Sequence, residues 1–404
     1  MEKYKILRST LLIIVISVIA ACSSSPSKNN EITTHKIQDH SKVNKIYFAG
    51  FALSGDNQSS KINFPYTFAL MNEKIDRGMS KLDIDAQNAI KLIKNPNLQI
   101  ITSELGDYKK DQGISAAVVI DSEDVSQEVI GGHVKIVVTL RGQIVAFNFK
   151  EMKVIGSYPL TAELIDAKDR KLSEQEVAAS VKQLYGSFIR ELVDRFNKIS
   201  INTDYTRGIQ IKNIVIPNDI AKSIQKSNQS TKDIQTFVAR NFEKYLSINQ
   251  NVAILPFTKD QSVGGRLSAR FSNGEIYNLE IPSPDYTISL ELKKMKSVPV
   301  TSNAVEDVYG YLSIMNIKAE QPEMKKTYLD FDVRYVLPVT IPKSMTDHDD
   351  RAHYLESTIQ LVNTFSKQVT LQDSDWLETW VETGKKEPKD EQIVQFLDVI
   401  NKCK

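Results

Sequence analysis

Two hydrophobic periods alternate along this chain, and they limit its fold more than any other feature. From Leu329 to Leu337 an apolar residue stands at every second position, as in a strand with one buried face. From Val177 to Phe196 apolar residues recur every three or four positions, as in a helix that buries one stripe. Segments of both kinds follow one another from about residue 45 to about residue 370. The pattern predicts an α+β fold.

The predicted elements form two related units, each a mixed or antiparallel sheet with helices packed on one side. In the first unit, residues 42–200, strands are predicted at 45–53, 98–101, 114–120, 133–140 and 143–153. In the second unit, residues 201–370, strands are predicted at 209–216, 252–257, 287–293, 309–318 and 328–337. Residues 371–404 are predicted to follow as a C-terminal helical tail.

A local similarity supports an internal repeat. Phe147–Lys153 reads Phe-Asn-Phe-Lys-Glu-Met-Lys, and Leu290–Lys296 reads Leu-Glu-Leu-Lys-Lys-Met-Lys. The spacing of the other elements differs between the two halves, so a chance match is the alternative.

The helix that closes the first unit has a marked start. Ser173 and Glu176 stand three residues apart, as in a capping box, and Leu172 is placed to pack on Val177. This helix is predicted to bury Val177, Val181, Leu184, Phe188, Leu192 and Phe196.

The first 21 residues have the pattern of a secretion signal. Lys3, Lys5 and Arg8 precede an apolar run over residues 11–21 that only Ser17 interrupts. This run is too short for a permanent transmembrane helix, which needs about 20 apolar residues.

The end of that signal resembles the lipobox of bacterial lipoproteins. Ile19-Ala20-Ala21-Cys22 has an aliphatic residue and two small residues before the cysteine, with isoleucine where leucine is commonest. The resemblance implies diacylglycerol on the Cys22 thiol, cleavage between Ala21 and Cys22, and acylation of the new amino terminus, commonly by palmitate. An ordinary secreted protein with a cysteine in its signal is the alternative.

Ser23 follows that cysteine, and in the sorting rule of lipoproteins serine there implies transfer to the outer membrane, with the body facing the periplasm. Residues 22–41 are polar and are predicted to form a flexible tether.

Removal of residues 1–21 leaves 383 of the 404 residues, enough for two or three domains, and a charge close to neutral. This balance does not favour binding to nucleic acid. Cys403 would then be the remaining thiol, which excludes an intramolecular disulfide. Its place near the carboxyl terminus predicts a bystander on a frayed tail, and cross-linking to a partner is the alternative.

The segment from Asp347 to His353 is the densest cluster of metal-ligand residue types. On a helix, Asp349, Asp350 and His353 share one face at spacings that suit a metal site. The alternative is that Asp347 or its neighbour Thr346 caps the helix, whose positive end favours acids. We expect no metal, with Asp349 and His353 as the candidate ligands.

Two further motifs are weak. Ser223-Ile-Gln-Lys226 is similar to the Ser-x-x-Lys of penicillin-binding enzymes, but the Ser-Asp-Asn and Lys-Thr-Gly motifs of that family are missing. The pairs Gly131-Gly132 and Gly264-Gly265 lack nucleotide-binding spacing and predict turns. No catalytic residue is predicted.

Trp376 and Trp380 stand one helical turn apart. They are candidates for binding a partner. Packing of an amphipathic helix on the core is the alternative.

The segment Val252-Ala-Ile-Leu-Pro-Phe257 resembles a strand of the family that contains the amino-terminal domain of TolB and the curli secretion lipoprotein. In this chain it is predicted to be the second strand of its unit rather than the first. The resemblance implies binding to partners in an envelope machine, and it transfers no functional residue.

These features predict a non-catalytic envelope lipoprotein that binds or scaffolds other proteins in an outer-membrane assembly of the secretion or surface-appendage type. No cofactor is expected besides the lipid on Cys22. A cell-wall enzyme whose site the sequence does not display, and a carrier of a small apolar ligand, are the alternatives.

Overall fold

The computed structural model describes residues 44–404, except for positions 56, 77–78, 103–112, 131, 202–206, 226–229, 258–265, 272–273, 346–349 and 383–387. The signal, Cys22 and the tether therefore lie outside the described residues. The described part is an α+β fold, as predicted.

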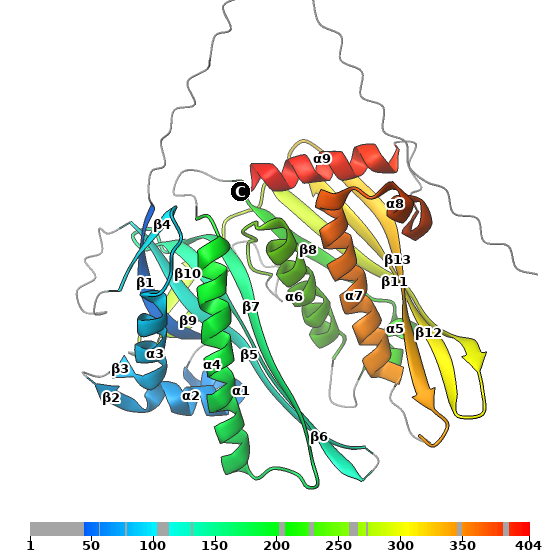
Figure 1. Ribbon diagram of the computed structural model, residues 1–404. Helices are drawn as coiled ribbons and strands as arrows, with labels where there is room; N and C mark the ends of the chain where they lie inside the picture. The colour runs from blue at the N-terminus through cyan, green and yellow to red at the C-terminus, as the bar shows by residue number, and fades with distance from the viewer. Residues whose placement is uncertain are drawn as a thin grey trace, which may run out of the picture. The chain divides into compact units, whose positions relative to one another are not determined.

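The first sheet combines parallel and antiparallel strands (Figure 1). Its first five strands, in sheet order, are β4 (Leu98–Ile101), β1 (Asn44–Ser54), β5 (Ile114–Ile130), β6 (His133–Asn148) and β7 (Lys153–Lys168). β1 pairs in parallel with β4 and β5, and β5, β6 and β7 form an antiparallel meander. The short β2 (Lys74–Asp76) and β3 (Met79–Ser80) form a separate ribbon.

Helices cover one face of this sheet. They are α1 (Asn57–Asn63), α2 (Pro65–Asn72), α3 (Lys81–Ile90) and the long α4 (Glu174–Lys198). The predicted capping box of Ser173 and Glu176 is confirmed, and the predicted apolar stripe of α4 is buried throughout. Alternate strand residues such as Ala116, Val118 and Ile120 pack in the same core as α4.

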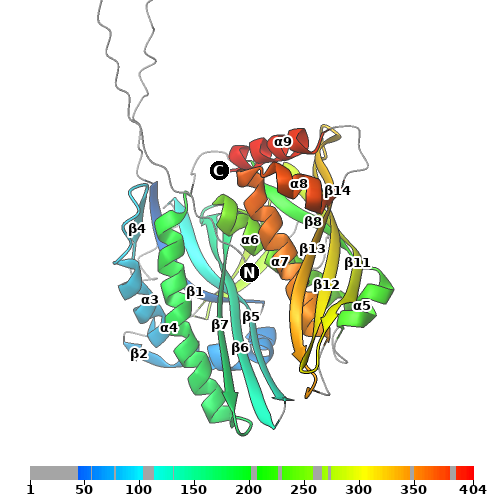
Figure 2. The same cartoon turned by 45° about the vertical axis from the view of Figure 1, so that its right-hand side comes forward.

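The second sheet repeats this plan. In sheet order its strands are β8 (Ile209–Val215), β11 (Tyr286–Ser302), β12 (Glu306–Gln321), β13 (Lys326–Pro342) and the short β14 (Val381–Glu382). Its helices are α5 (Asn218–Ile224), α6 (Thr231–Gln250), α7 (Asp350–Leu371), α8 (Ser374–Trp380) and α9 (Lys389–Lys402). Figure 2 shows α6 and α7 side by side on one face of this sheet.

The predicted repeat is confirmed at the level of strand order. β8 is parallel to β11, and β11, β12 and β13 form an antiparallel meander, as β1, β5, β6 and β7 do. Leu255 pairs in parallel with Gln210 of β8, which is the position of β4 beside β1. The predicted strand at 252–257 is reduced in the structure to isolated bridges at Ile254 and Leu255.

The similarity that suggested the repeat does not join equivalent positions. Phe147–Lys153 spans the end of β6 and the first residue of β7, whereas Leu290–Lys296 lies within β11, the counterpart of β5. A better structural match is a bulge in the first strand of each meander. The register shifts between Ile120 and Ser122 in β5 and between Leu292 and Lys294 in β11.

Two strands from the second half of the sequence belong to the first sheet. β9 (Arg266–Phe271) pairs with β1, and β10 (Ile276–Glu280) pairs with β9 and, at Glu280, with β7. They enclose a second core on the face opposite α4, where Val119 and Phe147 contribute from β5 and β6. The division predicted near residue 200 therefore does not separate the two sheets.

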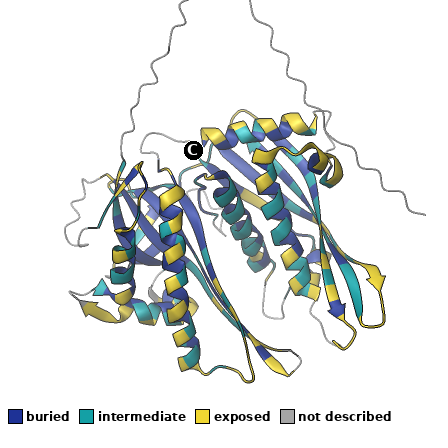
Figure 3. Cartoon of the chain, viewed as in Figure 1, coloured by how far each residue is buried: buried dark blue, intermediate teal, exposed yellow. Residues whose placement is uncertain are grey.

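Residues 371–404 pack on the second unit and are not a separate tail. β14 pairs with β13, and α9 buries Ile393, Phe396, Val399 and Ile400 in the core of that unit (Figure 3). The expectation that Cys403 is a frayed bystander is wrong, because its side chain is buried in this core. Burial raises the pKa of the Cys403 thiol to about 12.

None of the described helices is both long enough and apolar enough to span a membrane.

Candidate functional site

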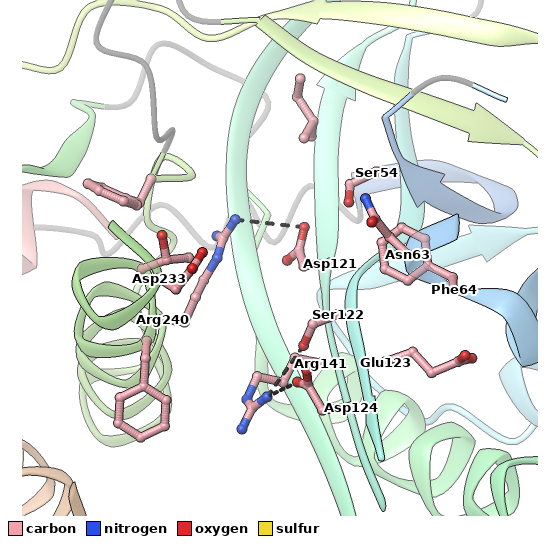
Figure 4. Close-up of a pocket in the computed structure, with 14 residues that line it drawn as sticks. Ser54, Asn63, Phe64, Asp121, Ser122, Glu123, Asp124, Arg141, Asp233 and Arg240 are labelled. Carbon is pink, nitrogen blue, oxygen red and sulfur yellow. Dashed lines mark hydrogen bonds and ion pairs between the residues drawn. The ribbon is translucent and has the colours of Figure 1, made fainter. Parts of the chain in front are cut away.

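A polar cleft of about 620 Å³ lies between α6 and the sheet face opposite α4 (Figure 4). Strands β5 and β6 supply Asp121, Ser122, Glu123, Asp124 and Arg141, and α6 supplies Asp233, Thr236, Phe237 and Arg240. The remaining lining residues are Ser54, Asn63, Phe64, Phe257 and Leu267. Both halves of the sequence therefore contribute to one site.

Asp121 lies on the face opposite α4 by strand alternation, after Ala117 and Val119, and the bulge in β5 brings Ser122 to the same face, where it pairs with Arg141. The residues before it, Ala116 to Ile120, are fully buried, and Asp121 faces Gln143 of β6. The Gln143 amide donates to both carboxylate oxygens of Asp121, at 3.2 and 3.0 Å. Arg240 Nη2 lies 3.7 Å from Asp121 Oδ1, and the Asp121 side chain is 11% exposed. Asp121 therefore forms the floor of the cleft.

Arg240 is shared between two carboxylates. Its Nη1 lies 3.0 Å from Glu243 Oε2 on the same helix, and Glu243 also accepts the Phe257 backbone N–H at 2.6 Å. Burial raises the pKa of both Asp121 and Glu243, although Arg240 acts in the opposite direction. Burial also opposes the charge of Arg240, but the two carboxylates outweigh it and raise the pKa of the guanidinium. The cluster buries two acids with one base.

Glu123 has a local structural role. Its carboxylate accepts the backbone N–H groups of Tyr66 and Thr67, at 3.0 and 2.7 Å, in the first turn of α2. An acid at a helix amino terminus satisfies donors that have no partner within the helix. Burial raises the pKa of Glu123, and these hydrogen bonds oppose that effect.

Arg141 and Asp124 form the exposed rim of the cleft. Arg141 Nη1 lies 2.6 Å from Asp124 Oδ2, and the Asp124 side chain is 61% exposed. Phe237 and Phe257 add partly buried rings to the lining. Fixed charges beside aromatic rings suit the cleft to binding a polar group.

The structure describes part of the predicted metal cluster. α7 begins at Asp350, which accepts a hydrogen bond from the Tyr311 hydroxyl at 2.5 Å. The His353 ring lies 4.9 Å from the Tyr311 ring, between centroids. Asp347, His348 and Asp349 lie outside the described residues. Within the described residues, no three potential ligands gather at a metal-binding position.

The other predicted motifs are accounted for locally. The Ser223 hydroxyl donates to the Asp219 carbonyl one turn earlier in α5, and Lys226 lies outside the described residues. Gly132 has φ +86° in the turn between β5 and β6. Gly131, Gly264 and Gly265 lie outside the described residues.

Both tryptophans pack on the core of the second unit. Trp376 is 8% exposed, and the partly buried Trp380 contacts the same cluster. The structure places them where the core-packing interpretation expects them.

The residues that meet in the cleft are not those that the sequence motifs singled out. Asp121 and Arg240 lie 119 positions apart, and neither belongs to a recognisable motif. One signal was present, because Asp121 directly follows five apolar residues in a predicted strand. A charge at that position requires a partner on another element.

Comparisons with known proteins give little for this chain. No protein-family model matches it, and no curated protein matches its sequence. One similar solved structure is the crystal structure of protein XCC0632 from Xanthomonas campestris, described as DUF330. That protein is 12% identical, and the match covers 44% of this chain and 94% of that one with a TM-score of 0.22. A similarity this distant carries no argument about function.

Proposed function

We propose that this protein is a lipid-anchored envelope protein that binds or scaffolds partner proteins and catalyses no reaction. We place it at the outer membrane, facing the periplasm, in an assembly of the secretion or surface-appendage type. One observation supports partner binding most directly: an aliphatic surface on the second sheet whose side chains are exposed or half-buried. We call this surface, formed by Val298, Val300, Leu312, Ile314 and Val336, the open face.

The open face lies opposite the helices of the second unit. In β12, Tyr311, Ser313 and Met315 are buried on the helix side, and Leu312 and Ile314 alternate with them. Val298, Val300 and Val336 are 42%, 64% and 37% exposed. Contiguous exposed aliphatic groups on a sheet favour a binding surface for another protein.

The flatness of the open face comes from Gly310. This residue pairs with Val298 on one side and Pro338 on the other. A Cβ atom at Gly310 would lie 3.0 Å from Val336 and 3.5 Å from Val300, so these two valines close over the glycine. The result is a continuous aliphatic surface across three strands.

A cell-wall enzyme is the second candidate, favoured by the three acids Asp121, Glu123 and Asp124 at one cleft. The contacts of each acid give it a structural role instead. Asp121 pairs with Arg240, Glu123 caps α2 and Asp124 pairs with Arg141. We therefore prefer the binding function.

The anchor is tested with radiolabelled palmitate in cells that make the full chain. Wild type should incorporate the label, and Cys22→Ala should not, because the thioether forms on that thiol. Cys403→Ser is the matched control and should remain labelled. The Cys22→Ala protein should keep its fold, because the sequence predicts a flexible tether between this site and β1. Label that persists in Cys22→Ala would refute the anchor.

A further inference from the structure

The repeat allows the open face to be compared with a surface whose occupant is known. In the first unit, α6 faces the side of the sheet opposite α4, across the cleft. In the second unit, the corresponding side carries the open face. The matching bulges align Asp121 with Lys293, and the rows beyond them align Asp124 with Lys296.

On the first unit, acids of the sheet face meet two basic residues of α6. Arg240 of α6 pairs with Asp121. Burial lowers the pKa of Lys244, while Glu191 of α4 and Glu163 of β7 favour its charge. Thr139 and Glu163 complete the row of Asp124 across β6 and β7. This is a polar interface held by opposite charges.

On the second unit, the counterparts of Asp121 and Asp124 are lysines, and the counterparts of Thr139 and Glu163 are uncharged. Lys293, Lys294 and Lys296 are exposed on β11, and Lys293 pairs with Asp332 of β13. The row of Lys296 continues through Leu312 and Val336, which replace Thr139 and Glu163. The neighbouring row joins Lys294 through Ile314 to Arg334. The counterpart surface is therefore basic along β11 and carries aliphatic groups on β12 and β13 beside Arg334.

We propose that the open face binds an acidic amphipathic helix of a partner protein, in the place that α6 takes on the first unit. Charge complementarity with Lys294 and Lys296 selects an acidic partner. The aliphatic rows take an apolar helix stripe. This inference rests on the proposed partner-binding function and names the chemistry of the partner.

An anionic membrane is the competing occupant for a basic and aliphatic surface. The geometry favours a helix, because the aliphatic side chains of the open face are valine, leucine and isoleucine and project only a short way from the strands. Surfaces that enter a bilayer usually carry tryptophan or other large groups. Crosslinking in cells and in lipid discs separates the two occupants.

The first experiment is photo-crosslinking in cells that make the full-length protein. A photoreactive amino acid replaces Val300, and the matched control replaces Val129, which is 67% exposed on the first sheet. We expect a protein adduct from position 300 and none from position 129. Mass spectrometry should place the crosslink in a helical segment with acids beside an apolar stripe.

Charge reversal then tests the complementarity. Lys294→Glu with Lys296→Glu should lower the adduct yield about tenfold, because two attractions become repulsions. The same two positions changed to arginine should keep the yield. Both lysines are exposed, so circular dichroism should show an unchanged fold. An adduct that charge reversal leaves unchanged would overturn the proposal, as would an adduct with a second copy of this chain.

The second experiment uses purified full-length protein in nanodiscs of neutral lipid. The probes are two synthetic helices with one leucine stripe, flanked by glutamates in one and by lysines in the other. We expect the acidic helix to bind at least about tenfold more tightly. Equal affinities for the two helices would overturn the proposal. In nanodiscs of phosphatidylglycerol, crosslinks from position 300 to lipid alone would also overturn it. If the protein is lipidated but its adducts map to another surface, the proposed anchor and scaffold function stands. Only the proposal for the open face is then rejected.

Discussion

Asp121 and Lys293 occupy the same bulge in the two repeats, yet their surroundings differ completely. Asp121 lies beneath α6 and shares the Arg240 guanidinium with Glu243, while Lys293 meets Asp332 at a surface that is 40% exposed on the lysine side. Both units have the same β-bulge. The effect of the bulge residue on stability depends on whether a helix covers its side chain.

The difference has an energetic reason. A buried charge must recover the cost of leaving water through close partners, and losing one partner leaves that cost uncompensated. An exposed pair is screened by water and salt, and its loss costs little. Substitutions at the two bulges should therefore differ in size, although they alter equivalent positions.

The largest effect is expected when Arg240 is removed. Arg240→Ala leaves Asp121 and Glu243 buried together without a cation, and we expect a loss of about 3–5 kcal/mol in the free energy of unfolding. Chemical denaturation measures this loss. Arg141→Ala is the matched control, because its partner Asp124 is 61% exposed, and it should cost less than about 1 kcal/mol. Equal losses in the two variants would show that the cluster under α6 is not a buried ionic site.

A smaller, pH-dependent effect is expected for Asp121→Asn. The variant leaves Arg240 with one acid, and its amide can donate to Gln143 Oε1, which accepts no hydrogen bond from the described residues. We expect the free energy of unfolding at about pH 8 to change by no more than about 1 kcal/mol.

The pH dependence follows from the raised pKa of Asp121. Between the ordinary range of aspartate, about pH 4, and the raised folded value, the folded state binds more protons than the unfolded state. The free energy of unfolding therefore falls as pH rises through this window. Asp121→Asn should reduce that fall, measured by denaturation across the pH range. An unchanged pH profile would show that Asp121 is ionised equally in both states.

The fold could be predicted from the sequence where one element carries its own pattern. The α4 stripe, its capping box and the strands β1, β4, β5, β8, β11, β12 and β13 depend on periodicity and on caps, which are local. The separate strands predicted at 133–140 and 143–153 are wrong, because β6 runs unbroken from His133 to Asn148 through Arg141 and Gly142, and β7 (Lys153–Lys168) was not predicted. The β9–β10 hairpin was missed because its strands are short and their partners, β1 and β7, lie far back in the sequence. Strand patterns do not specify distant partners.

The cleft could not be predicted for a related reason. Its central contact joins a strand of the first unit to a helix of the second, and no spacing rule links them. The prediction for Cys403 is wrong because nearness to a terminus does not imply exposure. The apolar stripe Ile393, Phe396 and Ile400 was the better guide, since it indicates a docked final helix.

The smallest effect is expected at Lys293, and it completes the comparison of the two bulges. Lys293 Nζ lies 2.8 Å from Asp332 Oδ2, and the hydrogen bond to Asp332 raises the pKa of Lys293. The pair is partly exposed, at 40% for Lys293 and 29% for Asp332, and Asp332 keeps a second donor, the Asn316 amide at 2.8 Å. Lys293→Met should therefore change the free energy of unfolding by less than about 0.5 kcal/mol, with a smaller difference at high salt. Asp332→Asn is the control and should cost more, because its new NH2 group must face one of two donors, the Asn316 amide or the Lys293 ammonium. If Lys293→Met cost as much as Arg240→Ala, the open face would have to be covered within this chain, and the proposed partner helix would have no surface to bind.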